Sequence, residues 1–230
     1  NGNLITDIDF KGIKNLKSLE IKRNKISDIS RLELNENLIM LDLSENHISS
    51  LSALPKLKNL NTLIVSDNSL SDLNFLRKHK NIENLVVKNN KIVMLDALSA
   101  HEKLKFIDLD NNYVENLLPL AFNKSIDTIC LKNNPIKKIN PLVFNYTLRD
   151  LFANNIKNEK LLKIILARNQ EISTSPIDDR NEIISKYNHS IQDDIIPFSL
   201  YTLAFFSKSI QDMELSRIPS HLQSPASLMH

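Results

Sequence analysis

The sequence predicts an α/β solenoid, a stack of short coils with one parallel β-sheet on its concave side and a C-terminal helical cap. Three observations predict this fold. Apolar positions recur every 22 residues, an asparagine keeps a fixed place in each recurrence, and helical periodicity replaces the repeat near residue 158. A constant period of this length is typical of architectures built by stacking similar units.

The recurring frame is L-x-x-L-x-L-x-x-N-x-I. Its asparagines are each 22 residues apart: Asn24, Asn46, Asn68, Asn90, Asn112 and Asn134. The alternation of apolar and polar residues in x-L-x-L-x predicts a half-buried strand with its leucines inward. The asparagine is expected to turn inward and satisfy backbone groups at the turn. Apolar residues at threefold spacing, such as Leu51, Leu54 and Leu57, are expected to fill the core from the convex side.

The array is expected to extend past the full frames at both ends. Residues 3–8 repeat the pattern of residues 24–29, so a truncated coil precedes the first full one. At the other end Leu148 and Leu151 keep the frame, whereas Ala153 and Ile156 replace its leucine and asparagine. The predicted boundaries are a solenoid over residues 1–157, a helical cap over 158–216 and a disordered tail over 217–230. Because the chain starts partway through a repeat, we expect it to be a fragment.

Three helices are expected in the cap. The first covers residues 159–170, where Leu161, Leu162, Ile165 and Leu166 have helical spacing. The second is expected to start at Ser175-Pro176, with serine as the cap and proline in the first turn. A third is expected after Pro197. Their expected role is to cover the open end of the solenoid, and a second binding surface or a membrane-lying element is the alternative.

The frames resemble the 22-residue class of leucine-rich repeats, which includes the bacterial internalins and the regulatory subunit of type-one protein phosphatase. The phrase I-[ST]-D-I at residues 5–8 and 26–29 is typical of that class. The resemblance covers about residues 3–157 and implies a solenoid fold and protein binding. With abundant Lys, Asn and Ile and a helical tail, the chain is also similar to repeat effectors that intracellular bacteria inject into host cells.

The outward positions of the strands are expected to stack in three columns, which we call the strand face. The central column is Glu20, Asp42, Ile64, Val86, Asp108, Cys130 and Phe152. The column before it is Ser18, Met40, Thr62, Asn84, Phe106, Thr128 and Asp150, and the column after it is Lys22, Ser44, Ser66, Lys88, Asp110, Lys132 and Asn154.

Apolar residues at these solvent-facing positions, rimmed by charge, indicate a protein-binding patch. The predicted partner-binding residues are Met40, Asp42, Ile64, Val86, Lys88, Phe106, Asp108, Asp110, Cys130, Lys132 and Phe152. The alternative is that the apolar members only reflect β-propensity, and that Phe152 packs under the cap.

The expected function is a module that binds a target protein, with inhibition of that target as one outcome, in a bacterial effector or effector regulator. The alternative is a scaffolding or regulatory subunit of a phosphatase-type enzyme. No catalysis, metal or cofactor is expected. Two glycines cannot build a phosphate loop, His79 and His101 share a frame position with Leu57 and lack a third ligand, and Cys130 has no histidine on its face. Chemistry on Cys130, or in a part of the protein before Asn1, remains the enzymatic alternative.

The composition of the chain bears on the class of partner and on the cellular compartment. The formal charge is +2 and no long basic block occurs, so a nucleic-acid partner is not expected. No apolar run is long enough to span a membrane. The single cysteine favours a reducing compartment, which would be the cytoplasm or, after secretion, a host cytosol. The chain is expected to be a monomer alone and to form a heterodimer with its partner.

Overall fold

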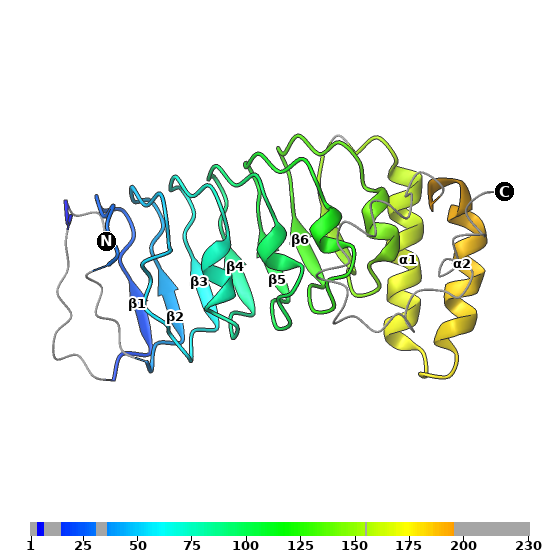
Figure 1. The fold of residues 1–230 in the computed structure, drawn as a ribbon, viewed down its shortest axis with the longest axis horizontal. Helices are drawn as coiled ribbons and strands as arrows, with labels where there is room; N and C mark the ends of the chain where they lie inside the picture. Colours follow the sequence, from blue (N-terminus) through cyan, green and yellow to red (C-terminus); the bar gives the residue numbers. More distant parts are fainter. Residues whose placement is uncertain (1–3, 7–14, 31–35, 155, 196–230) are drawn as a thin grey trace.

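The computed structural model is an elongated solenoid, described for residues 4–6, 15–30, 36–154 and 156–195 (Figure 1). Seven strands form one parallel sheet in chain order. They are β1 (Ser18–Glu20), β2 (Met40–Asp42), β3 (Thr62–Ile64), β4 (Asn84–Val86), β5 (Phe106–Asp108), β6 (Thr128–Cys130) and β7 (Asp150–Phe152). The predicted α/β solenoid with a parallel sheet is confirmed.

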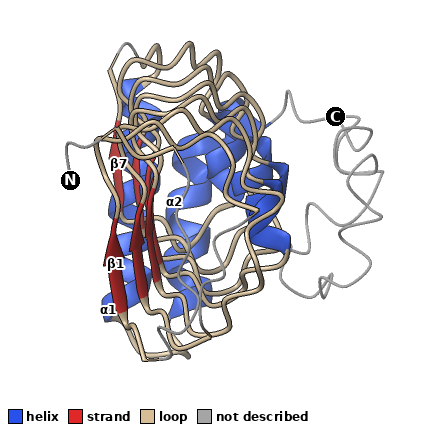
Figure 2. Cartoon of the chain, turned by 90° about the vertical axis from the view of Figure 1, so that its left-hand side faces the viewer, coloured by secondary structure: helices blue, strands red, loops and turns tan. Residues whose placement is uncertain are grey.

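The strand register equals the sequence repeat. Leu41 pairs with Leu63, and Leu63 pairs with Leu85, each 22 residues further on. These middle residues of the strands are fully buried, so the first and third residue of each strand face outward. Viewed along the molecule, the strands lie together on one side (Figure 2). One coil cannot bury its own apolar residues, and the stacked coils bury them together.

Short 3-10 helices line the opposite side of the coils. They are η1 (Asn74–Arg77), η2 (Asp96–Leu98), η3 (Leu118–Leu120) and η4 (Asn140–Phe144). The threefold apolar spacing of this segment matches the three residues per turn of a 3-10 helix. Side chains also begin these turns, since the Asp72 carboxylate accepts from the Asn74 amide at 2.8 Å and Asn116 does the same for Leu118 at 2.9 Å.

The frame asparagines turn inward and satisfy backbone groups, as predicted, and they also join each coil to the one before it. Asn90 Nδ2 donates to the carbonyl of Val87 at 3.0 Å in its own coil and to that of Val65 at 2.9 Å in the preceding coil. Its Oδ1 accepts from the amide of Leu70 at 2.9 Å. The same three kinds of bond recur at Asn46 and Asn112. The turn carbonyls that would otherwise be buried and unpaired are thereby satisfied.

A second internal polar ladder lies on the 3-10 side, at positions 79, 101, 123 and 145. Asn123 Nδ2 donates to the carbonyl of His101 at 3.0 Å, and its Oδ1 accepts from the amide of Ile126 at 2.8 Å. His101 makes equivalent bonds with its ring, since Nε2 lies 3.2 Å from the carbonyl of His79 and Nδ1 lies 3.1 Å from the amide of Leu104. The two histidines therefore hold backbone groups in neighbouring coils, and their ring nitrogens face the main chain.

A third ladder runs along the surface at the turns that follow β3 to β7. Asn89 Nδ2 donates to the Asp67 carboxylate at 2.7 Å, and Asn111 Nδ2 donates in turn to Asn89 Oδ1. Asn133 Nδ2 donates to Asn111 Oδ1 at 2.6 Å, and Asn154 Nδ2 donates to Asn133 Oδ1 at 2.7 Å. Four amides thus form a line that ends on one carboxylate.

Two helices follow the last strand. Helix α1 (Glu159–Thr174) extends four residues past its predicted end, and the Asn158 side chain caps it by accepting from the Leu161 amide at 3.0 Å. Helix α2 (Arg180–Ile195) begins later than expected. Pro176 lies instead in a turn in which the Asp179 amide reaches the Pro176 carbonyl at 3.3 Å. The expected third helix and the expected disordered tail lie outside the described residues.

Helix α1 packs against the last coil through a buried arginine. Arg168 is fully buried, and its Nη1 and Nη2 donate to the carbonyls of Val143 at 2.7 Å and Asn145 at 2.6 Å. Its guanidinium lies 4.3 Å from the centre of the Tyr146 ring. Burial lowers the pKa of Arg168 to about 10. The carbonyls of Val143 and Asn145, at the end of η4, are therefore satisfied by a side chain of α1.

Among the described residues, none of the helices has the length and apolar character that crossing a membrane requires.

Candidate protein-binding surface

The first and third residues of the strands form two of the three columns predicted for the strand face, and the third column follows two residues after each strand. In the central column the register places Ile64 beside Val86, then Asp108 beside Cys130, then Cys130 beside Phe152. In the column before it Met40 lies beside Thr62, and Phe106 lies between Asn84 and Thr128.

The apolar residues consequently form two pairs in the central column. Ile64 and Val86 make the first pair and Cys130 and Phe152 the second, with Asp108 between them. Phe106 lies on the same strand as Asp108. The two apolar pairs and Phe106 therefore form a band across β3 to β7, which we call the apolar band. Met40 is separate from this band, with Thr62 and Asn84 between it and Phe106.

Exposure on the strand face is lower than predicted for most of these residues. Met40, Ile64, Val86, Phe106 and Cys130 are half-buried, and Phe152 is 48% exposed. The coils stack so closely that each side chain is partly covered by its neighbours in the adjacent coils. Half-buried apolar side chains still offer surface to a partner, and Phe152 offers the most.

Asp42 departs furthest from the prediction, because it is only 7% exposed. Its carboxylate accepts from the Ser44 amide at 2.9 Å and lies 3.8 Å from Lys22 Nζ. Lys22 also pairs with Glu20 at 3.2 Å, and that hydrogen bond raises the lysine pKa. The N-terminal end of the strand face is therefore occupied by its own ion pairs, which the sequence frame alone did not indicate.

A charged group lies in the middle of the strand face. The Asp108 carboxylate accepts from the Asp110 amide at 2.9 Å, and Asp110 accepts from the Lys132 amide at 2.7 Å. Burial, together with the neighbouring charge of Asp110, raises the pKa of Asp108, while its hydrogen bond and the cations Lys88 and Lys132 act in the opposite direction. The predicted charges Lys88, Asp108, Asp110 and Lys132 are thus brought together by the fold.

Cys130 lies beside this charged group. Burial raises the pKa of its thiol, and Asp108 and Asp110 raise it further. A protonated thiol is a weak nucleophile, since the thiolate is the reactive form. Its place between Asp108 and Phe152 suits a contact residue.

A family model described as leucine-rich repeats (two copies) matches residues 36–78. Solved structures match over a longer stretch. An internalin (inlF) from Listeria monocytogenes shares 26% identity with a TM-score of 0.51, over 62% of this chain and 48% of that one. An internalin C2 from the same organism shares 25% identity with a TM-score of 0.53, over 62% of this chain and 73% of that one.

The functional domain of InlJ from Listeria monocytogenes shares the fold, with a TM-score of 0.52 at 24% identity over 64% of this chain and 32% of that one. The chain thus spans about half the length of the inlF structure and a third of the InlJ structure. Curated protein sequences give no match.

Proposed function

Because this chain is a leucine-rich-repeat solenoid with the fold of the internalins, we propose that it binds a target protein through the strand face. The apolar band across β3 to β7 is the observation that carries the proposal. Apolar side chains that gather on an outward face and are bordered by charged ones are typical of a surface that binds another protein.

Phe106 and Phe152 are the proposed anchors. Aromatic side chains contribute most strongly to interface energies when they fill a pocket on the partner. Lys88, Asp108, Asp110 and Lys132 flank the anchors and would set the orientation of the partner by charge complementarity. A rigid surface of this kind could inhibit an enzyme by covering its active site.

The biological setting is part of the same proposal. The structural relatives named above are internalins of a bacterium, and we propose that this chain acts as a bacterial effector or effector regulator. The lone cysteine supports a reducing setting, which is the bacterial cytoplasm or a host cytosol. A regulatory subunit of a phosphatase-type enzyme would use the same face, so the identity of the partner separates these roles.

Affinity capture with mass spectrometry tests the proposal. The bait is the wild-type chain or a variant with Phe106→Ala and Asp108→Lys, used against bacterial and host-cell lysates. The matched control carries Tyr113→Ala and Asp96→Lys, an exposed aromatic and an exposed acid outside the strand face. We expect one partner that the variant loses and the control keeps.

Affinity measurements with the captured protein then test each anchor. Phe106→Ala and Phe152→Ala should each weaken binding by about 1–3 kcal/mol while the chain stays folded, which circular dichroism checks. If both single variants bind as tightly as the wild type, the interface lies on another surface.

A further inference from the structure

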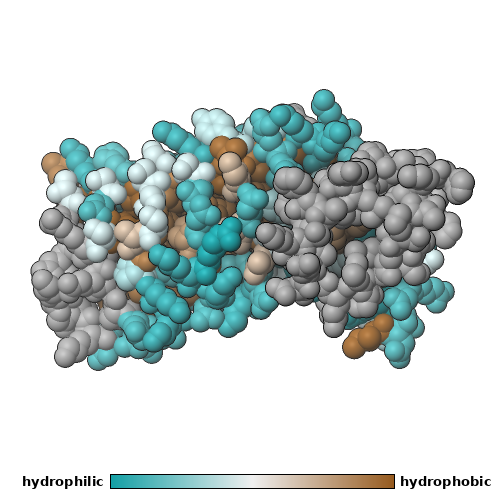
Figure 3. Space-filling view, viewed as in Figure 1, coloured by the Kyte–Doolittle hydropathy of each residue, from teal (hydrophilic) through white to brown (hydrophobic). Residues whose placement is uncertain are grey.

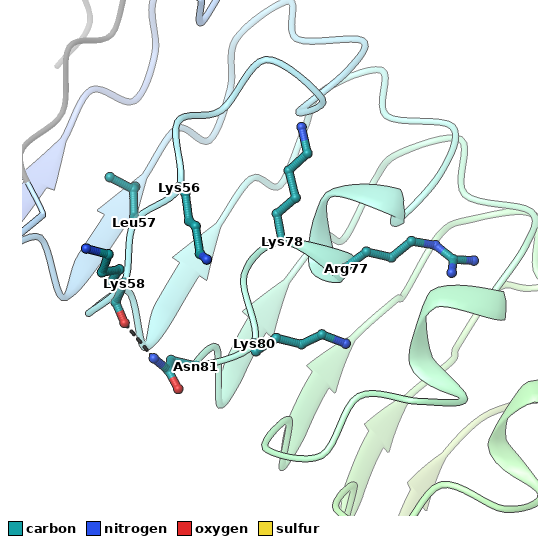
Figure 4. A pocket seen from close by; sticks show the side chains of 7 residues that line it. All are labelled: Lys56, Leu57, Lys58, Arg77, Lys78, Lys80 and Asn81. Carbon is teal, nitrogen blue, oxygen red and sulfur yellow. Dashed lines mark hydrogen bonds between the residues drawn. The ribbon is translucent and has the colours of Figure 1, made fainter. Parts of the chain in front are cut away.

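A basic hollow lies away from the strand face, where two coils turn from their 3-10 side back toward β3 and β4. It has a volume of about 540 Å³. Five of the seven residues that line it are basic, and we call the cavity the basic hollow (Figure 4). The basic residues are Lys56, Lys58, Arg77, Lys78 and Lys80. The remaining lining residues are Leu57 and Asn81. The charged ends point in different directions, with Lys58 and Arg77 extending away from each other (Figure 4).

The repeat brings these cations together. Lys56 and Lys78 occupy one frame position in successive coils, and Lys58 and Lys80 occupy another, each pair separated by 22 residues. The coils are joined at this point, because Asn81 Nδ2 donates to the Lys58 carbonyl at 2.6 Å. Like charges at adjacent positions of a stack repel one another. The stacked lysines therefore lower the free energy of unfolding, and an anion bound between them would reverse this effect.

Few acidic groups neutralise the basic hollow. Within the described residues Lys58 pairs with Glu36 at 3.1 Å, and this pair is exposed. Lys78 Nζ lies 3.4 Å from the carbonyl of Ser52, and no ion pair to a carboxylate is found for the other four cations in the same part of the chain. On the side of the molecule seen in Figure 3, hydrophilic side chains cover the lower part of the middle coils, and white and brown patches lie among and above them.

The excess of basic over acidic side chains is greatest over two coils, because acids reappear among the lysines on both sides. Glu36 bounds this region on one side. On the other side lies a second hollow of mixed charge, where Glu83 and Glu102 stand among Lys103, Lys105 and Lys124 and Lys105 pairs with Glu83 at 3.0 Å. A duplex nucleic acid or a membrane surface would be attracted by a longer positive face. A region of this width fits a short, extended segment with a few carboxylates.

We infer that the basic hollow is a docking site for an acidic segment of a partner protein. Carboxylates of the segment would pair with the lysines and Arg77, and an apolar side chain between them would lie against the lysine stems. The site is independent of the proposed strand-face interface, since the basic hollow and the three columns have no residue in common.

Fluorescence anisotropy of the full chain tests this inference. The probe is a fluorescein-labelled short peptide of glutamates around a central leucine, and the same peptide with glutamines replaces it as the uncharged comparison. We compare the wild type, a variant with Lys56→Glu and Lys80→Glu, and a charge-matched control with Lys91→Glu and Lys160→Glu. All four lysines are exposed, so the variants should fold, which circular dichroism checks.

The expected result is a loss of affinity of about tenfold or more in the hollow variant and unchanged affinity in the control. Binding should weaken as salt is added and should be absent for the glutamine peptide. An equal loss in the control would show an effect of net charge alone and overturn the inference. So would tight binding of the glutamine peptide. Displacement of the probe by single-stranded DNA, or by phosphatidylserine vesicles, at lower concentration than by the unlabelled peptide would also overturn it.

Discussion

In each coil the residue before the buried asparagine has a positive φ, between 55° and 61°. Four of the six positions hold Asp or Asn, which tolerate the left-handed region better than other residues with a side chain. Arg23 and Glu45 hold the other two, and their exposed side chains pair at 2.9 Å. The repeat therefore imposes the left-handed conformation at this position in every case, and the first two cases hold Arg and Glu, which adopt it less readily than Asn or Asp.

Replacement of Glu45 by asparagine should raise the free energy of unfolding by about 0.5–1 kcal/mol, because the left-handed backbone is strained for glutamate. The exposed pair with Arg23 contributes little once salt is present. Urea unfolding in moderate salt measures the change. The reverse change, Asn111→Glu, is the comparison and should lower stability. Equal midpoints for all three proteins would refute the strain argument.

His101 makes stability depend on pH. Burial lowers the pKa of His101, and Lys80 lowers it further, while the hydrogen bond to His79 and the charge of Glu102 act in the opposite direction. The unfolded chain therefore takes up the proton at higher pH than the folded chain. Stability is full above the ordinary histidine pKa near 6.5 and declines as the pH falls through the lowered pKa of the folded state.

Replacement of His101 by asparagine should remove this part of the acid sensitivity, since Asn123 and Asn145 already occupy the same position in later coils. One titrating group changes stability by at most about 1.4 kcal/mol per pH unit. Urea midpoints from neutral pH to about pH 5 measure the slope, with His47→Asn, an exposed histidine, as the control. A slope identical to that of the wild type would contradict the assignment.

At the scale of the element, helix α1 completes the last coil rather than simply covering it. Leu161 and Ile165 are buried in the common core. Asn169 donates to the carbonyls of Asn145 at 3.0 Å and Leu148 at 2.6 Å, as the Thr147 hydroxyl, 22 residues earlier, donates to the carbonyls of Asn123 and Ile126. The internal ladder of the 3-10 side therefore continues from the repeats into the helix.

Arg168→Met should lower the free energy of unfolding by about 2–4 kcal/mol, because the buried carbonyl of Val143 loses its side-chain donor, the carbonyl of Asn145 keeps only Asn169, and the Asn169 oxygen loses the guanidinium. Chemical denaturation measures the change. Lys163→Met, at an exposed position of the same helix, is the control and should change stability little. A loss below that of the control would mean that other donors replace the guanidinium.

At the scale of the molecule, most of the fold follows from the 22-residue frame. The frame predicts the seven strands, the inward asparagines and the columns of the strand face, because stacked coils repeat one geometry. It does not predict the burial of Asp42, which depends on a turn to Ser44 and on a lysine of the preceding coil. The late start of α2 depends on the turn around Pro176. The sequence shows the lysines of the basic hollow at matching frame positions. That they and Arg77 line one cavity follows only from the stacked structure.

The position of a coil in the array should decide how much its asparagine stabilises the protein. Asn90 bonds to the carbonyl of Val65 and the amide of Leu70 in the preceding coil, whereas the bond found for Asn24 with the described residues before it is the one from the Ile5 amide. Asn90→Ala should therefore lower the free energy of unfolding by about 3 kcal/mol, and Asn24→Ala by roughly half of that. Equilibrium unfolding of both variants compares them, and equal losses would contradict nearest-neighbour stacking.

The surface line of amides gives the array an electrical direction. From Asn154 to Asn89 each amide donates toward the N-terminal end, and the last one meets the carboxylate of Asp67. Aligned amides polarise one another in the same sense. The amides of Asn89, Asn111 and Asn133 are parallel, with their positive ends toward Asp67, while the Asn154 oxygen turns back to accept from the Asn133 backbone amide at 2.7 Å. An approaching charge therefore meets a carboxylate at one end of this line and neutral amides at the other.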